Sequence, residues 1–136
     1  MVLVDTSVWV DFFRDRPDPH VTALQELIQA DSDLALCGII LTEVLQGIRA
    51  DSDCRRTKVY LDALTYLPML PATYVRAAHI FRSLRRKGVT IRKTVDCMIA
   101  SVAIEHDLFL LHNDRDFDLI AADSKLRVLN IEGPGG

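Results

Sequence analysis

The chain has 136 residues, of which 49% are hydrophobic, enough for one compact domain with its own core. Its longest apolar runs are too short to cross a bilayer, so we expect a cytoplasmic protein with no membrane partner. The net charge of −3 disfavours a general nucleic-acid binder, and three widely spaced cysteines without a CxxC pair disfavour a disulfide framework or a zinc site.

Short apolar segments alternate with longer segments of helical period in the first half of the chain. Strands are predicted at residues 2–4 and 34–37, with a first helix at 8–13 and a second at 21–30. Two more helices, at 40–48 and around 59–67, would follow before the next strand. We expect part of this long crossover to extend from the sheet as a clip or partner surface.

The second half continues the pattern with a short strand near Met69 and Leu70, a helix over 73–87 that ends at Gly88, and a helix over 94–106. Strands follow at 108–111 and 127–131, with a helix beginning near Asp114. The sequence therefore predicts an α/β fold: a three-layer α/β/α domain over 1–132 with a short, mostly parallel central sheet flanked by helices. A flexible tail is expected at 133–136.

Acidic residues follow two of the predicted strands. Asp5 comes directly after the first strand, and Asp114 and Asp116 follow the strand at 108–111. Each could simply cap the helix that it precedes. The carboxyl ends of strands in a parallel sheet are also where ligands bind, and the pair Asp114 and Asp116 has no evident role in the fold alone.

Two further acids lie on predicted helices. Glu43 borders an apolar helix face, where a surface glutamate is the ordinary interpretation. Asp96 shares its side of a helix with Ile99, Ala100 and Ala103, so it points toward the interior unless it only stabilises the helix amino terminus. A carboxylate that faces apolar side chains needs a cation or hydrogen-bond donors. One shared metal explains the acids better than five separate roles do.

A basic stripe covers residues 63–95, which contain no acid. Seven of the sixteen Lys and Arg residues lie there: Arg76, Arg82, Arg85, Arg86, Lys87, Arg92 and Lys93. Taken alone, this stripe has two equally good interpretations: a solvated helix face, or a track for a phosphate backbone. Next to a carboxylate cluster, the track becomes the better hypothesis.

The segments that carry these acids resemble the PIN-domain ribonucleases, and most closely the VapC toxins of type II toxin-antitoxin pairs. The resemblance extends from Leu3-Val4-Asp5-Thr6-Ser7-Val8-Trp9 through Leu41-Thr42-Glu43-Val44 and Asp96-Cys97-Met98-Ile99-Ala100 to Asn113-Asp114-Arg115-Asp116-Phe117. It covers nearly the whole chain, and the four segments together at these separations are a specific match.

The resemblance implies a Mg²⁺-dependent endoribonuclease, with Mn²⁺ as a possible substitute, that cleaves transfer or ribosomal RNA by metal-activated water. It implies a catalytic set of Asp5, Glu43, Asp96, Asp114 and Asp116, of which Asp5, Asp96 and Asp114 hold the metal. RNA contacts are expected from Thr6, the hydroxyl beside the first acid, and from the stripe residues Arg82, Arg85, Arg86, Lys87 and Arg92.

The implied partners are RNA, a small VapB-type antitoxin and a second copy of the chain, in a homodimer and a toxin-antitoxin hetero-oligomer. The first crossover and the exposed parts of the first helices are the expected antitoxin surface. One residue departs from the family: His112 stands where Thr or Ser is usual. The supporting role of that hydroxyl would pass to Asn113 or to water, or be lost.

Three alternatives compete with a nuclease. A haloacid-dehalogenase-like phosphatase also begins with an aspartate after the first strand, but it needs a second acid where this chain has Ser7. A phospho-acceptor receiver domain needs an acid pair near the amino terminus and a lysine after a late strand, whereas Lys125 precedes the last strand. A catalytically silent PIN binding module would keep the fold, and the intact acid set argues against it.

Overall fold

We describe a computed structural model of the chain over residues 1–131. Five strands form one sheet in the order β3-β2-β1-β4-β5, and all four neighbouring pairs are parallel. The strands are β1 (Val2–Val4), β2 (Leu34–Cys37), β3 (Thr65–Leu67), β4 (Phe109–Leu111) and β5 (Arg127–Val128). The expectation of a short parallel sheet in an α/β fold is confirmed.

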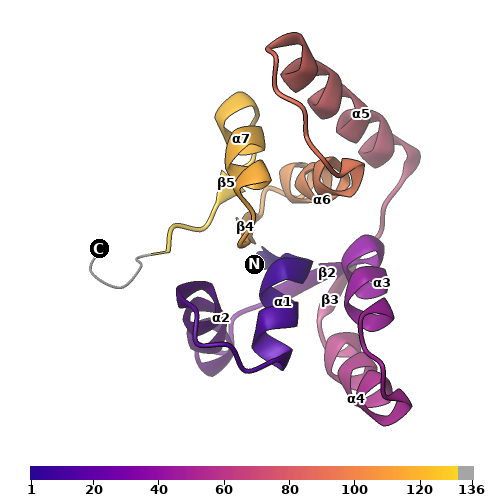
Figure 1. The fold of residues 1–136 in the computed structure, drawn as a ribbon, viewed down its shortest axis with the longest axis vertical. Coiled ribbons are helices and arrows are strands. Elements are labelled where there is room, and N and C mark those ends of the chain that lie inside the picture. The colour runs from indigo at the N-terminus through magenta and orange to yellow at the C-terminus, as the bar shows by residue number, and fades with distance from the viewer. Residues whose placement is uncertain (132–136) are drawn as a thin grey trace.

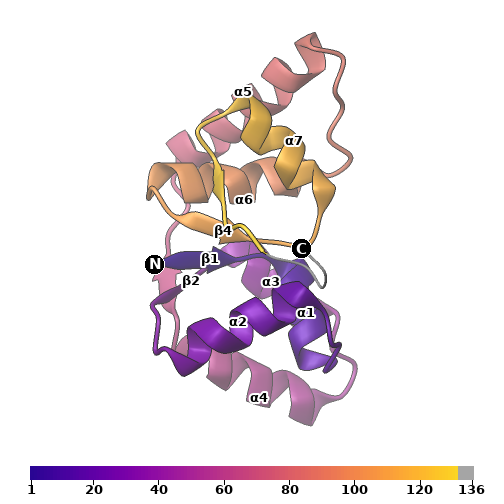
Figure 2. The same ribbon diagram turned by 90° about the vertical axis from the view of Figure 1, so that its left-hand side faces the viewer.

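Seven helices cover the two faces of this sheet, and Figure 2 shows it between α1–α4 on one side and α5–α7 on the other. Figure 1 shows the same elements along the chain, with the N-terminus, where β1 begins, beside β4 at the centre. The helices are α1 (Thr6–Phe13), α2 (Pro19–Gln29), α3 (Gly38–Gln46), α4 (Asp51–Asp62), α5 (Pro71–Arg86), α6 (Thr94–Glu105) and α7 (Arg115–Asp123). The three predicted layers are therefore present.

The core lies on both faces of the central strands. β1 and β2 are buried along their whole length, as continuous apolar strands of a parallel sheet are. Trp9 of α1 and Phe117 of α7 are the largest fully buried side chains, one from each helical layer. These two helices begin shortly after β1 and β4, so their packing fixes the positions of the carboxyl ends of those two strands.

The third strand lies earlier than the sequence suggested. We expected it near Met69 and Leu70, but β3 ends at Leu67 and pairs with β2 through Leu67 and Cys37. Pro68 has no N–H for a ladder, and Pro71 opens α5 with Leu70 as its cap, so the segment between the prolines cannot continue the strand.

The fourth helix was also predicted too late in the chain, since it begins at Asp51. It ends at Asp62, so Leu64 follows it and Leu67 belongs to β3. The last strand is shorter than predicted, although Leu129 N still donates to Leu110 O at 2.9 Å beyond its end. The predicted tail at 133–136 and the domain boundary at 132 lie outside the described residues. Within residues 1–131, no helix is long and apolar enough to cross a membrane.

Candidate active site

The carboxyl ends of β1 and β4 lie beside each other and bring the first and the fourth acidic segments together. Val4 pairs with Leu111, and Asp5 N donates to Leu111 O at 2.9 Å. Asp5 then caps α1 and Asp114 caps α7. Asp5 and Asp114 thus lie at the same edge of the sheet, where the two parallel strands end.

Asp5 is 5% exposed and is held by a residue that the sequence reasoning did not select. Its Oδ2 accepts from Ser7 N at 3.0 Å and from Ser7 Oγ at 2.6 Å, while Ser7 Oγ accepts from Asn113 N at 3.0 Å. Ser7 therefore connects the start of α1 to the turn before α7. Burial raises the pKa of Asp5, and the hydrogen bonds from Ser7 oppose this rise.

Three carboxylates form the densest part of the site. One oxygen from each of Asp96, Asp114 and Asp116 lies within 4.8 Å of the other two. Asp96 and Asp116 are buried, and within the described residues Oδ2 of each is without a hydrogen-bond partner. Two buried carboxylate oxygens without donors carry a high energetic cost, which a bound cation removes.

The electrostatics of Asp96 reflect this crowding. Burial raises its pKa from an ordinary 3.8 to about 7; Lys93 opposes the rise, and the neighbouring carboxylates Asp5, Asp114 and Asp116 add to it. The direction is what burial and like charges both produce when no cation is bound. The site therefore has the chemistry of a divalent-cation site: hard oxygen ligands, excess negative charge and partial burial.

Glu43 lies on α3 and faces the same site, where its Oε1 accepts from Thr6 Oγ1 at 2.8 Å. The expected contact of Thr6 with RNA stays a prediction, and in the structure its hydroxyl fixes the orientation of Glu43. Thr6 is the first residue of α1 and Asp5 its cap, so one turn of chain holds two of the five acids in place.

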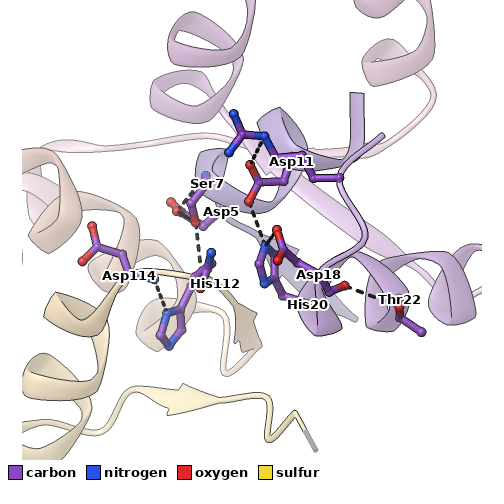
Figure 3. A network of polar contacts seen from close by, with 10 residues as sticks. Asp5, Ser7, Asp11, Asp18, His20, Thr22, His112 and Asp114 are labelled. Atoms are coloured by element: carbon purple, nitrogen blue, oxygen red, sulfur yellow. Dashed lines mark hydrogen bonds and ion pairs between the residues drawn. The ribbon is translucent and has the colours of Figure 1, made fainter. Parts of the chain in front are cut away.

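His112 lies where the family usually has a hydroxyl residue, and it performs a positioning task through its ring. Its Nδ1 accepts from Asp114 N at 3.0 Å, and its Nε2 lies 3.3 Å from Asp118 Oδ1. The ring also packs on the buried Phe117 at 5.2 Å between centroids. A hydrogen-bond acceptor is therefore present at this position, two residues before Asp114 (Figure 3).

A pocket of about 390 Å³ opens at this edge of the sheet, and we call it the acidic pocket. Its lining includes Asp5, Glu43, Asp96, Asp114, Lys93 and Arg16. Asp116 does not line it, but one of its carboxylate oxygens lies within 4.8 Å of oxygens of Asp96 and Asp114, which do. The five predicted acids are thus brought to one place, four of them in the lining of the pocket and Asp116 next to them.

Six cations of the basic stripe divide into two groups. Arg92 Nε lies 3.7 Å from Asp116 Oδ2, and Lys93 Nζ lies 4.0 Å from Asp114 Oδ2, so both are at the site. The four residues near the end of α5 do not line the acidic pocket: Arg82, Arg85, Arg86 and Lys87. Figure 2 shows that the end of α5 and the α5–α6 connection lie on the same side as the amino-terminal ends of α6 and α7.

Sequence reasoning missed a second polar group beside the acidic pocket. Asp11 lies on α1 and accepts from His20 Nε2 at 2.9 Å, while Arg16 Nε lies 3.7 Å from Asp11 Oδ1. Figure 3 shows Asp11 and His20 facing each other next to Asp5 and Ser7. These residues follow no strand and fit no familiar ligand spacing, so the sequence held no signal that would have selected them.

Two solved structures share the fold. The first is VapBC2 from Rickettsia felis bound to a DNA fragment from its promoter, with a TM-score of 0.75, 21% identity and coverage of 96% of this chain and 98% of that one. The second is a toxin-antitoxin complex from Klebsiella pneumoniae, with a TM-score of 0.67, 22% identity and coverage of 85% and 88%.

The sequence comparisons identify the family. Ribonuclease VapC11 from Mycobacterium tuberculosis is 35% identical over 129 residues, which is 93% of this chain and 96% of that protein. The family model of the PIN domain matches residues 2–123, a range that holds all five acids. The chain therefore belongs to the PIN domain family and, within it, to the VapC ribonucleases.

Proposed function

We propose that this protein is a Mg²⁺-dependent endoribonuclease that acts in the cytoplasm as the toxin of a type II toxin-antitoxin pair. One observation carries the metal-dependent part: Asp96, Asp114 and Asp116 place carboxylate oxygens within 4.8 Å of one another, two of them buried. Family membership supports the nuclease part. It also disfavours the phosphatase, which needed an acid at the position of Ser7.

The residues fit a small divalent cation. Mg²⁺ takes oxygen ligands and keeps several waters, so one or two carboxylates suffice, and Mn²⁺ accepts the same ligands. We assign the metal to Asp96 and Asp114 with Asp5 beside them, and Asp116 to the support of that set. When bound, the ion supplies charge stabilisation at the phosphoryl group and lowers the pKa of water.

The remaining acid is placed to handle a proton or a water. Glu43 enters the acidic pocket from the opposite layer to Asp96 and is oriented by the 2.8 Å hydrogen bond from Thr6. A carboxylate fixed in this way can accept a proton from an attacking water, provided that the water lies within hydrogen-bond reach. We therefore assign Glu43 to orient the nucleophile.

RNA approaches a site that is itself negative, so it needs cations. We propose that Arg92 and Lys93 contact the backbone next to the cleaved bond, and that Arg82, Arg85, Arg86 and Lys87 extend the track along α5. Their exposure, and the position of the end of α5 on the same side as the amino-terminal ends of α6 and α7, support this assignment. Transfer or ribosomal RNA is the proposed substrate.

Metal-dependent cleavage is the direct test of this function. Purified protein, freed of any antitoxin, should cut total bacterial RNA in Mg²⁺ or Mn²⁺ and leave it intact in EDTA, because the clustered carboxylates cannot hold a phosphate without a cation. Sequencing of the new 5′ ends identifies the RNA and the site. Cleavage that persists in EDTA would contradict the metal mechanism, and intact RNA in every condition would favour a silent binding module.

The antitoxin needs a surface of its own. An apolar groove of about 640 Å³ lies between α1, α3 and α4, and its lining includes Val10, Phe13, Val44, Ile48, Thr57 and Tyr60. Phe13 stacks on Trp9 at 5.7 Å and meets Tyr60 edge-on at 5.9 Å, yet it remains 38% exposed. We propose that the antitoxin places an amphipathic segment here, in a hetero-oligomer that also contains a second copy of this chain.

Phe13→Ala should weaken the complex with the antitoxin encoded beside this chain by about 30-fold, since buried aromatic anchors contribute about 2 kcal/mol or more at interfaces. Calorimetric titration of the two purified proteins measures the change. Val75→Ala, which truncates an apolar residue that is 56% exposed on α5, is the matched control and should leave the affinity unchanged. Equal affinities for both variants would place the antitoxin elsewhere.

A further inference from the structure

Two cations line the acidic pocket from different elements. Lys93 caps α6, and Arg16 lies in the connection between α1 and α2. The other charged side chains that line the pocket within residues 1–131 are carboxylates. Within this lining, Arg16 and Lys93 are therefore the side chains that attract a polyanionic substrate.

Arg16 is held at the pocket by a chain of contacts. Its backbone N donates to Asp11 O at 3.0 Å, and its Nε lies 3.7 Å from Asp11 Oδ1. Asp11 in turn accepts from Nε2 of His20, which is 5% exposed and so cannot swing away. The backbone at Asp15 is left-handed, with φ of 59°, which fixes the turn that presents Arg16.

The guanidinium nevertheless keeps its donors free. At 3.7 Å its contact with Asp11 is an ion pair but too long for a hydrogen bond, and within residues 1–131 its N–H groups donate to no side chain. The side chain is 57% exposed. An arginine that is anchored at one edge and open at the other has the planar fork of donors that suits a phosphate.

We infer that Arg16 contacts an RNA phosphate next to the cleaved bond, across the acidic pocket from Lys93, and that Asp11 and His20 act as positioning residues for it. The inference rests on the proposed ribonuclease function. It adds a further cation to the substrate path, from the helical layer opposite to that of α5. The competing explanation is that Arg16, Asp11 and His20 only fasten α1 to α2.

RNA binding at several salt concentrations separates the two explanations. We would use the Asp5→Asn background, which suppresses cleavage and keeps the three clustered carboxylates for Mg²⁺, with a short labelled RNA of mixed sequence as the probe. Arg16→Ala should raise the Kd about fivefold or more at low salt and reduce the slope of log K against log salt by about 0.7, the value of one phosphate contact on a single strand. Arg16→Lys should keep most of the slope.

Arg55→Ala is the matched control, because it removes one exposed arginine from α4, away from the acidic pocket. Its slope should equal that of the background protein. The triple change Arg85→Ala, Arg86→Ala and Lys87→Ala should lower the slope separately, and its effect should add to that of Arg16→Ala because the sites share no partner. In the otherwise wild-type protein, Arg16→Ala should raise the KM for RNA cleavage and leave kcat within about twofold of the wild-type value.

The positioning role has its own readout. When Asp11 is already replaced by Asn, the arginine is no longer held at the pocket. The fold-change in Kd that Arg16→Ala causes should then be less than half of the fold-change that it causes in the presence of Asp11. An undiminished effect would remove Asp11 from the inference. Equal salt slopes for Arg16→Ala and Arg55→Ala would overturn it entirely. If the background protein binds no RNA and the wild type cleaves none, the proposed function fails as well.

Discussion

Replacement of Asp96 by Asn should reduce RNA cleavage by at least about 100-fold, since residues that merely support metal ligands already contribute 10- to 100-fold. Asp96 is the deepest member of the carboxylate triple, is 3% exposed, and has an oxygen without a hydrogen-bond partner in the described structure. The amide keeps the shape of the side chain but removes the charge that a cation needs. Initial rates at saturating Mg²⁺ on the mapped RNA measure the loss.

The matched control for this change is Asp62→Asn, which neutralises an acid on α4 that is 54% exposed and paired with Lys58. It should cleave at the wild-type rate, since a surface ion pair contributes at most about 1 kcal/mol to stability and lies far from the reaction. Circular dichroism should show that both variants are folded. Substantial cleavage by Asp96→Asn at the wild-type Mg²⁺ requirement would remove this residue from the metal site.

The same carboxyl should control how stability depends on pH when no divalent ion is present. The pKa of Asp96 is raised to about 7 in the folded chain, so the folded state holds a proton that the unfolded state has already released near pH 4. Between these limits the folded chain binds more protons, and the free energy of unfolding falls as the pH rises. The contribution of Asp96 to the free energy of unfolding is fully present below about pH 4 and is lost above about pH 7.

In EDTA, Asp96→Asn should therefore be more stable than the wild type above pH 7, by up to about 4 kcal/mol, the free energy that corresponds to a pKa change from 3.8 to about 7. Near pH 4 the two proteins should be equally stable. Urea unfolding over this range measures the difference, and Mg²⁺ added above pH 7 should restore the wild type alone. A constant difference across the pH range would refute the burial of an ionisable group at this position.

The sequence predicts those features of the fold that depend on local patterns of apolar residues, and it misses those that depend on contacts between distant segments. The sheet was predictable because its apolar strands are short and buried on both faces, as the complete burial of β1 and β2 illustrates. β3 was misplaced because Leu64 and Leu67 continue the apolar period of α4, whereas Pro68 decides where the strand must end. Local periodicity could not reveal that Cys37 offers Leu67 a partner.

In the candidate site, too, residues with a local sequence signal were predicted and contacts between distant residues were not. Asp5 and Asp114 were found because each follows a strand, and parallel strands bring such positions to one edge. The bond from Thr6 to Glu43 joins residues 37 positions apart, so no sequence pattern could have revealed it. Arg16 was missed for a similar reason: its importance comes from a buried histidine in the next helix, which is a property of the packed structure.

The central claim is that the acidic pocket binds the divalent ion on which cleavage depends, and calorimetric titration of Mg²⁺ into the metal-free protein near pH 7 tests it most directly. Because the pKa of Asp96 lies near 7 without the ion, binding should release protons, which two buffers of different ionisation enthalpy detect. The account predicts a binding isotherm with proton release for the wild type, and much weaker binding without proton release for Asp96→Asn. The same isotherm and the same proton release from both proteins would contradict it.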